Sequence, residues 1–309
     1  MTTRTPARDD AATRRDVGLR WDAAGQVSLS GPLLHLQQSL DAAFLLLAGH
    51  WDASEEAHPA FLDATVLDLI DYLDAFPQLA NFGAALDDDD RNLEAFREGP
   101  PIDDDGAVRL TRLAPVRQLL TPAACYHLYV QHRGELVEQP LYLTTRNTCF
   151  RREAEYRPLR RQRAFEMREI VCVGERGEVI TFLDEAIQIV TRLLEEFDLP
   201  TTWDIATDPF FRPAERAEPL FQRVHATKRE ATYGGDLAIA SVNMHEDHFG
   251  GAFAISTPGG PATSGCVAFG LDRWLWALTD RHGVDPDRWP SPLAAARAAL
   301  DHHAAQVMP

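Results

Sequence analysis

The stretch from Cys149 to Glu169, CFRREAEYRPLRRQRAFEMRE, concentrates side chains that bind phosphate. It holds seven arginines and four glutamates, although the whole chain carries 30 Lys plus Arg against 47 Asp plus Glu, a net charge of −17. A guanidinium group bonds phosphate oxygens in pairs. Such a segment in an acidic protein predicts either a segregated nucleic-acid face or a site that handles a triphosphate.

Lysine is almost absent from the chain. The only lysine is Lys228, in HATKREAT, and the other 29 basic residues are arginines. We interpret Lys228 as a position that needs the compact charge of an ammonium group and could not use the planar guanidinium group of an arginine. The alternative is that one lysine survived by chance in an arginine-rich composition.

The four cysteines are Cys125, Cys149, Cys172 and Cys266. In a chain of this size they do not predict a disulfide framework, so they are packing residues, metal ligands or nucleophiles. Their spacing is too wide to identify a metal site by itself, because a tandem CxxC pair would be the strong signal.

The arginine-rich stretch is predicted to form a strand, a loop at 156–163 and a second strand. Period-two alternation places Cys149, Arg151 and Glu153 on one face of the first strand. On the second strand, Glu169 shares a face with Phe165, Met167 and two valines. A carboxylate on an apolar face is costly to bury unless a cation, a metal or hydrogen-bond donors accompany it.

Other elements follow from hydrophobic periodicity. Helices are predicted at about 32–48, 61–76, 178–199, 271–282 and 291–306, and strands at 123–135, 139–153, 237–257 and 264–270. Ser241 and Asn243 alternate onto one face of the 237–257 segment, where they become candidates for contact with a substrate. The absence of a β-α rhythm and of a glycine-rich phosphate loop predicts an α+β domain on an antiparallel sheet flanked by helices.

Composition bounds the domain organisation. Residues 1–25 are polar and predict a flexible tail, and residues 26–309 predict one domain with an acidic surface excursion at about 87–106 and a helical insertion at about 180–200. No apolar run is long enough for a transmembrane helix, and the N-terminus lacks the apolar stretch of a signal peptide. We therefore expect a cytoplasmic protein without membrane contact.

Two segments together resemble sequence motifs of a known family. The segment CFRREAEYRPLRRQRAFEMREIVCVG resembles motif 2 of the class II aminoacyl-tRNA synthetases, and SGCVAFGLDRWLWAL resembles motif 3; WDASEEAHPAF with its preceding helix is a weaker motif 1. The fuller pattern over about 26–309 is similar to the atypical seryl-tRNA synthetases of methanogens. It is above all similar to their truncated relatives, the amino acid:[carrier protein] ligases.

The resemblance implies roles for particular residues. Arg151 would hold the α-phosphate of ATP, Glu153 would lie at the adenine and Arg273 would lie along the γ-phosphate. Lys228 would act near the activated carboxylate. Further ATP-binding positions on the same pattern are Arg163, Phe165 and Glu230. The substrate-binding positions are Ser241, Asn243 and His248.

The resemblance also implies cofactors. Cys125, Glu169 and Cys266 match positions that hold Zn²⁺, which takes the substrate's amino group, and Mg²⁺ accompanies ATP. Cys149 and Cys172 have no such match and are predicted to be core thiols.

The resemblance implies activation of a small amino acid, glycine or alanine with serine left open, followed by transfer to the phosphopantetheine thiol of a small acidic carrier protein. We expect a homodimer. Charging of tRNA is not expected, because the related full synthetases carry a substantial N-terminal domain that grips tRNA and only about 25 residues precede the first core helix here. The docking face is expected at the arginine-rich loop or at the helix at 182–198. Three alternatives stay open: a small-molecule acceptor, a tRNA acceptor, and a non-catalytic paralogue.

Overall fold

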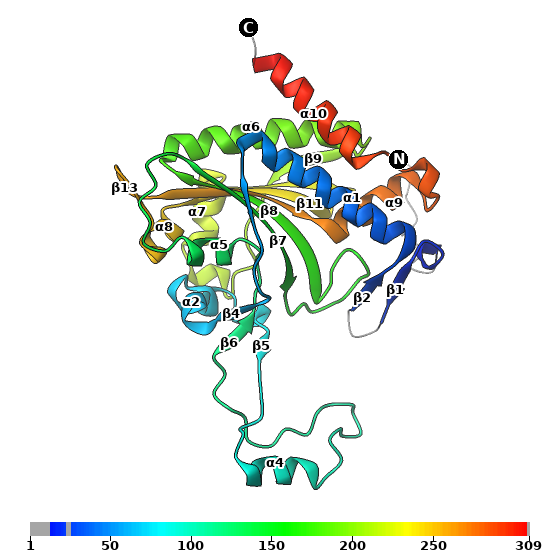
Figure 1. Cartoon of the computed structure of the whole chain (residues 1–309), viewed down its shortest axis with the longest axis vertical. Coiled ribbons are helices and arrows are strands. Elements are labelled where there is room, and N and C mark those ends of the chain that lie inside the picture. Colours follow the sequence, from blue (N-terminus) through cyan, green and yellow to red (C-terminus); the bar gives the residue numbers. More distant parts are fainter. Residues whose placement is uncertain (1–12, 23–25, 308–309) are drawn as a thin grey trace.

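A seven-stranded sheet forms the centre of the computed structural model, which describes residues 13–22 and 26–307 (Figure 1). Its strands, in spatial order, are β3 (Ser54–Glu56), β7 (Leu141–Phe150), β8 (Ala164–Gly174), β14 (Thr263–Gly270), β11 (Leu237–Glu246), β10 (Lys228–Tyr233) and β9 (Thr201–Ile205). Only the edge pair β3–β7 is parallel. The predicted α+β fold on a largely antiparallel sheet is confirmed.

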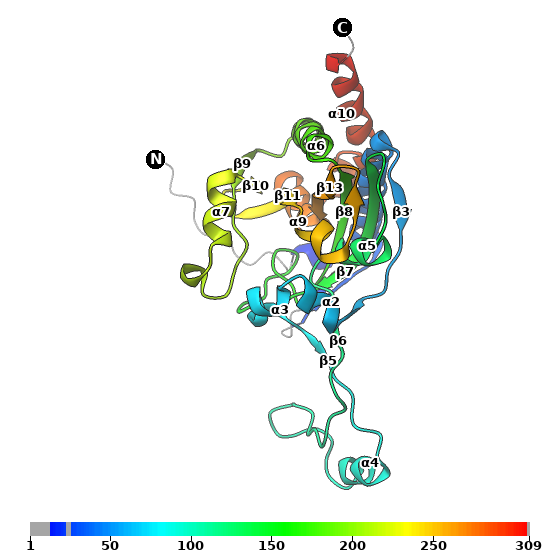
Figure 2. The ribbon, with the colours of Figure 1, turned by 90° about the vertical axis from the view of Figure 1, so that its left-hand side faces the viewer.

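Four helices cover one face of this sheet. They are α1 (Gly31–Ala48), α6 (Arg176–Glu196), α9 (Leu271–His282) and α10 (Pro292–Val307). Their apolar sides meet inward-facing strand residues such as Ile170 and Val267 in one large core, in which Phe44 stacks on Phe269 with ring centroids 4.1 Å apart. Figure 2 shows the layer of helices edge-on against the sheet.

Shorter helices border the opposite face. These are α2 (Ala64–Leu69), α3 (Tyr72–Ala75), α5 (Tyr126–Gln131), α7 (Glu218–His225) and α8 (His248–Phe253). A second apolar cluster packs α2, α5 and α8 against Val171 and Cys266 of the sheet. Because this cluster covers only part of the face, it leaves room for a cavity over the remaining strands.

The acidic segment lies on an arm that extends from the body (Figures 1 and 2). The arm contains α4 (Asp90–Arg97). A small sheet connects the arm to the body, and its strands in spatial order are β4 (Phe61–Asp63), β6 (Gln118–Leu120) and β5 (Phe82–Gly83). Two further pairs complete the strands: β1 (Leu19–Trp21) with β2 (Val27–Leu29), and β12 (Ser256–Thr257) with β13 (Gly260–Pro261).

Three predicted elements differ in the structure. The segment 123–135 contains the helix α5 in place of a strand, with the adjacent residues Leu128 and Tyr129 both buried. The strand at 237–257 stops at Glu246, whose φ of 50° turns the chain into α8. The helix at 61–76 is divided into β4, α2 and α3, because Asp71 has a φ of 56° and breaks the helical path.

Two predictions about the chain's organisation concern segments that lie in the main core. Residues 13–22 do not form a flexible tail, because Val17 and Leu19 are buried in the main core; residues 1–12 and 23–25 lie outside the described residues. The helix predicted at 180–200 is part of the main core, because α6 buries Phe182, Ile189 and other apolar residues against the sheet; whether it is an insertion relative to the synthetase fold stays a prediction. Among the described helices, none is both long and apolar enough to cross a membrane.

Candidate active site

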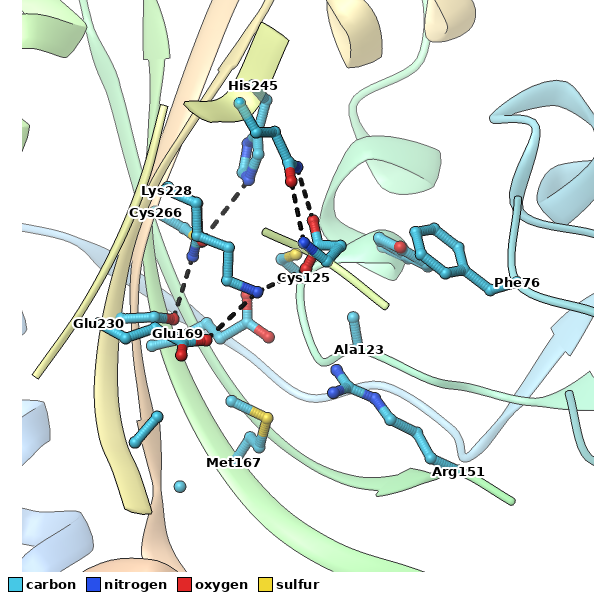
Figure 3. Close-up of a pocket in the computed structure, with 18 of the residues that line it drawn as sticks. Phe76, Ala123, Cys125, Arg151, Met167, Glu169, Lys228, Glu230, His245 and Cys266 are labelled. Atoms are coloured by element: carbon cyan, nitrogen blue, oxygen red, sulfur yellow. Dashed lines mark hydrogen bonds and ion pairs between the residues drawn. The ribbon is translucent and has the colours of Figure 1, made fainter. Parts of the chain in front are cut away.

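A cavity of about 740 Å³ lies over β8, β14, β11 and β10, on the face of the sheet opposite α6 (Figure 3). Strand register explains why residues distant in sequence meet there. Residues directly opposite each other in an antiparallel pair share a face of the sheet. Two such rows cross the cavity floor, Lys228–Asn243–Cys266 and Glu230–Ser241–Ala268–Glu169.

Cys125, Glu169 and Cys266 gather at one end of the cavity, which we call the thiol end. All three are at most 3 % exposed. Cys125 stands at the start of α5, and the preceding amide of Ala124 donates a hydrogen bond to Glu169 Oε1 at 3.0 Å. Cys266 Sγ lies 3.3 Å from Asn243 Nδ2 and 3.7 Å from His245 Nε2.

Electrostatics at the thiol end suit a cation. Burial, followed by the neighbouring Cys266, raises the pKa of Glu169 to about 7. A hydrogen bond from Cys125 lowers the pKa of the Cys266 thiol and raises that of Cys125 itself, so the pair favours one thiolate. Two sulfur ligands and a carboxylate match the ligands that Zn²⁺ prefers. Within the described residues their ligand atoms do not all lie within 4.8 Å of one another, so a bound ion would draw them together.

Arg151 and Arg273 form the opposite end of the cavity, the arginine end. Arg151 Nε donates to Pro122 O at 3.0 Å, and its guanidinium lies 5.3 Å from the ring centroid of Phe165. Arg273 donates to the carbonyls of Arg160 and Ala238 at 3.1 and 2.9 Å. Backbone carbonyls therefore hold both groups without neutralising them.

The other four cations that line the cavity each have a carboxylate partner. The pairs are Arg160–Asp236, Arg161–Glu153, Arg216–Asp74 and Lys228–Asp208. In the described part of the chain, Arg151 and Arg273 have no carboxylate at ion-pair distance. Burial, and then the charge of Arg151, lower the pKa of Arg273. An anion between the two guanidinium groups would relieve this repulsion.

The two ends are separated along β8. Phe165, under the Arg151 guanidinium, marks the arginine end, Glu169 marks the thiol end, and Met167 lies between them on the same face. Four residues of extended strand span roughly 13 Å. This length allows one elongated ligand to carry an anionic group at one end and an amine at the other.

Lys228 lies between the ends and forms the centre of a polar network. Its Nζ contacts Asp208 Oδ1 and lies 3.4 Å from Glu230 Oε1. Burial acts to lower the pKa of Lys228, but Asp208 and Glu230 outweigh it and raise the pKa. Gln222 holds Asp208 in place by donating to Oδ2 at 2.8 Å, so the ammonium group is fixed and fully charged.

Known proteins resemble this chain in sequence and structure. The family model described as tRNA synthetase class II core domain (G, H, P, S and T) matches residues 116–255. Amino acid–[acyl-carrier-protein] ligase 1 of Bradyrhizobium diazoefficiens is 32 % identical over 270 residues, which are 84 % of this chain and 82 % of that protein. The chain belongs to the family of amino acid–[acyl-carrier-protein] ligases.

More distant relatives agree with this family assignment. The type-2 serine–tRNA ligase of Methanopyrus kandleri is 26 % identical over 193 residues, covering 57 % of this chain and 37 % of that protein. A crystal structure of M. kandleri SerRS with A. aeolicus tRNASec has a TM-score of 0.76 at 20 % identity, covering 97 % of this chain and 63 % of that one. The class II synthetase fold of the ligase family is thereby shown.

Most residues that the motifs single out line the cavity of this ligase-family chain. They are Cys125, Arg151, Glu153, Phe165, Glu169, Lys228, Glu230, Ser241, Asn243, His248, Cys266 and Arg273. Cys149 and Cys172 are buried in the interior and do not line it, as expected for core thiols.

Arg163 is the exception, because its side chain is exposed and does not line the cavity. The alternation breaks in the loop before β8. Gln162 turns inward there, accepts from Leu159 N–H at 2.8 Å and donates to Ala164 O at 3.1 Å. The inward position of Gln162 leaves Arg163 outside, and the loop arginines on the cavity wall are Arg160 and Arg161.

Three cavity residues were missed by the sequence analysis. Asp208 lies in a loop before α7, where no periodicity identifies it. His245 contacts Cys266 at the thiol end through Nε2, and its Nδ1 lies 3.2 Å from Tyr129 Oη. Asp272 directly precedes Arg273, is 5 % exposed, and accepts from Glu166 N–H at 2.8 Å.

Proposed function

We propose that the protein activates a small amino acid, glycine or alanine, with ATP and transfers it to the phosphopantetheine thiol of a carrier protein. The observation that carries this proposal is that the two ends of the cavity favour opposite charges. Two guanidinium groups without carboxylate partners lie at one end, and a cation-binding set of two thiols and a carboxylate lies at the other. An aminoacyl-adenylate has the matching charges.

In the first step, a carboxylate oxygen of the amino acid attacks the α-phosphorus of ATP. The bond from this phosphorus to the oxygen bridging to the β-phosphate breaks, and pyrophosphate leaves. Mg²⁺ bound with ATP would offset part of the phosphate charge. Arg151 and Arg273 are placed to stabilise the negative charge that spreads over the phosphate oxygens. Lys228 is placed to hold the carboxylate in line, because Asp208 fixes its ammonium group.

The thiol end would select the amino acid. Cys125, Glu169 and Cys266 would hold Zn²⁺, which supplies an open coordination position for a free α-amine. Asn243 and Ser241 line the wall beside Cys266. The stacked rings of Tyr129 and Phe249, 4.1 Å apart between centroids, pack behind Cys125. These rings restrict the space for a side chain, which supports a small substrate.

In the second step, the acceptor sulfur attacks the carbonyl carbon of the adenylate, the bond from this carbon to the phosphate oxygen breaks, and AMP leaves. The acceptor must enter at the cavity mouth. Helix α7 borders this mouth through Phe221 and Gln222, and it exposes Leu220 by 61 % and Val224 by 67 %. We propose α7 as the docking face in place of α6, which lies on the other face of the sheet.

Pyrophosphate exchange across all amino acids, with and without a chelator, tests activation. We expect exchange with glycine or alanine and loss of exchange after metal removal. Absence of exchange with every amino acid would show that the chain is a non-catalytic paralogue. Exchange that resists the chelator would contradict the zinc role.

Parallel acceptor assays separate the remaining alternatives. We expect an acid-stable, hydroxylamine-sensitive thioester on a carrier that bears phosphopantetheine and none on the same carrier without it. Charging of tRNA, or exchange without loading of any carrier, would contradict the proposed acceptor. A homodimer and a cytoplasmic location are part of the proposal, and light scattering of the full chain tests the first.

A further inference from the structure

A second group of potential metal ligands lies far from the cavity. His50 belongs to the short 3₁₀ turn Gly49–Trp51 that follows α1, Glu185 lies on α6, and His303 lies on α10. None of them lines the cavity described above. Figure 1 shows α1, α6 and α10 meeting on the helical face of the sheet, and α10 packs against both other helices.

The three side chains already have the arrangement that a small cation needs. One ligand atom from each residue lies within 4.8 Å of the others. The imidazole rings of His50 and His303 have centroids 5.4 Å apart and planes at 84°. Two imidazoles on one tetrahedral ion, with Zn–N bonds of about 2.0–2.1 Å, place their centroids roughly 5 Å apart. The observed separation fits this value.

His303 provides an independent sign of a missing partner. It is 5 % exposed, and its buried Nδ1 atom has no hydrogen-bond partner within the part of the chain that the structure describes. A buried polar atom without a partner is costly, and native proteins rarely retain one. Coordination of a metal by the His303 ring would either use this nitrogen directly or leave it as a donor that needs a partner near the ion.

Glu185 is oriented by a neighbour in the way metal-binding carboxylates often are. Its Oε2 accepts a hydrogen bond from Trp51 Nε1 at 2.9 Å and lies 3.9 Å from His50 Nε2. The side chains of His50 and Glu185 are 30 % and 33 % exposed, so an ion can arrive from solvent without passing through the cavity.

We propose that His50, Glu185 and His303 bind a divalent transition-metal ion, with Zn²⁺ as the best match, and that this ion joins α10 to α1 and α6. Two imidazoles and a carboxylate suit Zn²⁺, and water from the exposed side completes the coordination. The need for such a link follows from the contact surface of α10. Its buried residues are largely small, such as Ala296 and Ala299, and they bury little apolar area.

Zinc counting on the full chain, purified without a histidine tag, tests the site. The variants are His50→Ala and His303→Ala, and the matched control is His302→Ala, which removes an exposed histidine one position along the same helix. After equilibrium dialysis against Zn²⁺, we expect each of the two variants to bind one ion fewer per chain than the control. This difference does not depend on occupancy of the thiol end.

Two outcomes overturn the proposal. One is an equal zinc count in His50→Ala and His302→Ala, because His50 is exposed and its removal should not unfold the chain. The other concerns thermal stability. Because a link between helices must stabilise the folded state, Zn²⁺ should raise the melting temperature of the His302→Ala control more than that of His50→Ala. Equal rises in the two variants would contradict the proposal. Co²⁺ substitution identifies the ligands: the cobalt lost with His50→Ala should show d–d absorption without a thiolate charge-transfer band.

Discussion

The arginine end and the thiol end of the cavity are formed by the same strands, but they favour ligand groups of opposite charge. At the arginine end, Arg151 and Arg273 are held by carbonyl oxygens and keep their full charge. At the thiol end, burial raises the pKa of Glu169 to about 7, so the acid is poised between its neutral and ionised forms until a cation arrives. The arginine end therefore favours an anion, and the thiol end favours a cation.

This difference orients a substrate that carries both charges. A ligand placed backwards would bring a phosphate beside Glu169 and an ammonium group beside Arg273, and both contacts are repulsive. Lys228 reinforces the order from the middle of the cavity, because Asp208 and Glu230 keep it protonated. Under the proposed function the cavity would therefore fix the direction of its substrate, and the variants below disturb its two ends and its middle separately.

Loss of the arginine end should have the largest effect on catalysis. Arg151→Ala is expected to lower kcat for pyrophosphate exchange by about 10²–10³, the usual cost of removing one group that stabilises transition-state charge. Zinc content should stay unchanged, because the thiol end is intact. Exchange kinetics and metal analysis of the same preparation measure both quantities.

Arg152→Ala is the matched control, since Arg152 is the exposed neighbour of Arg151. Its kcat should remain within about twofold of the parent chain, because exposed charges contribute little. Equal losses in the two variants would show that the segment acts through its overall charge, and the position of Arg151 in the cavity would have no particular role.

Loss of the thiol end should instead affect the amino acid. Cys266→Ala removes a proposed zinc ligand, and we expect the KM for the amino acid to rise by at least about 100-fold, the upper range seen when even an outer partner of a metal ligand is lost. The Kd for ATP should not change. Cys172→Ala, at a core thiol outside the cavity, should keep both constants and serves as the control.

The sequence predicted the residues of both ends better than the elements that carry them. Glu169 was found because a carboxylate interrupts an apolar face, and its meeting with Cys266 follows from the pairing of β8 with β14. The six-residue helix at Cys125 was mistaken for a strand, because so short a segment shows no clear period. Helix periodicity was reliable where it was long, as in α1 and α6.

Other residues were beyond the reach of sequence patterns. Asp208 lies in an irregular loop, and its role depends on a contact with Lys228 across 20 positions. Arg163 was assigned to ATP binding through the family resemblance, but in the turn before β8 it is Gln162 that takes the inward position. His50, Glu185 and His303 come from three helices over more than 250 residues, so no spacing rule connects them.

Variants of the Lys228–Asp208 pair, in the middle of the cavity, should lower the rate by a smaller factor and should also lower the stability. Lys228→Met leaves the half-buried Asp208 without its cation, and because solvent screens this carboxylate we expect the free energy of unfolding to fall by only about 1 kcal/mol. The double variant with Asp208→Asn should regain much of this stability but not the rate, which we expect to stay about 10- to 100-fold low. Urea unfolding and exchange assays separate the two roles.

Arg229→Met is the control for this pair, because Arg229 is exposed on the other side of the same strand. It should change neither stability nor rate appreciably. Recovery of both properties in the double variant would mean that the charge of Lys228 has no part in the reaction, and the cavity would then orient its substrate by its two ends alone.

The last prediction concerns stability alone, at a buried acid of the arginine end that can be compared with Glu169. Burial raises the pKa of Asp272 from 3.8 to about 6. Because the folded state holds this proton more tightly than the unfolded chain, the wild type should lose stability as pH rises from about 4 to about 6. An asparagine carries no such cost. The gain of Asp272→Asn over the wild type should therefore grow over this range, by up to roughly 3 kcal/mol.

Urea unfolding of wild type, Asp272→Asn and the exposed control Asp287→Asn between pH 4.5 and 7.5 measures this gain. The control should show a constant difference from the wild type. A constant difference for Asp272→Asn as well would mean that Glu166 N–H and the nearby Arg146 compensate the buried charge fully. Asp272 would then be a satisfied structural acid, and Glu169 alone would need a cation, which would make the contrast between the two ends sharper still.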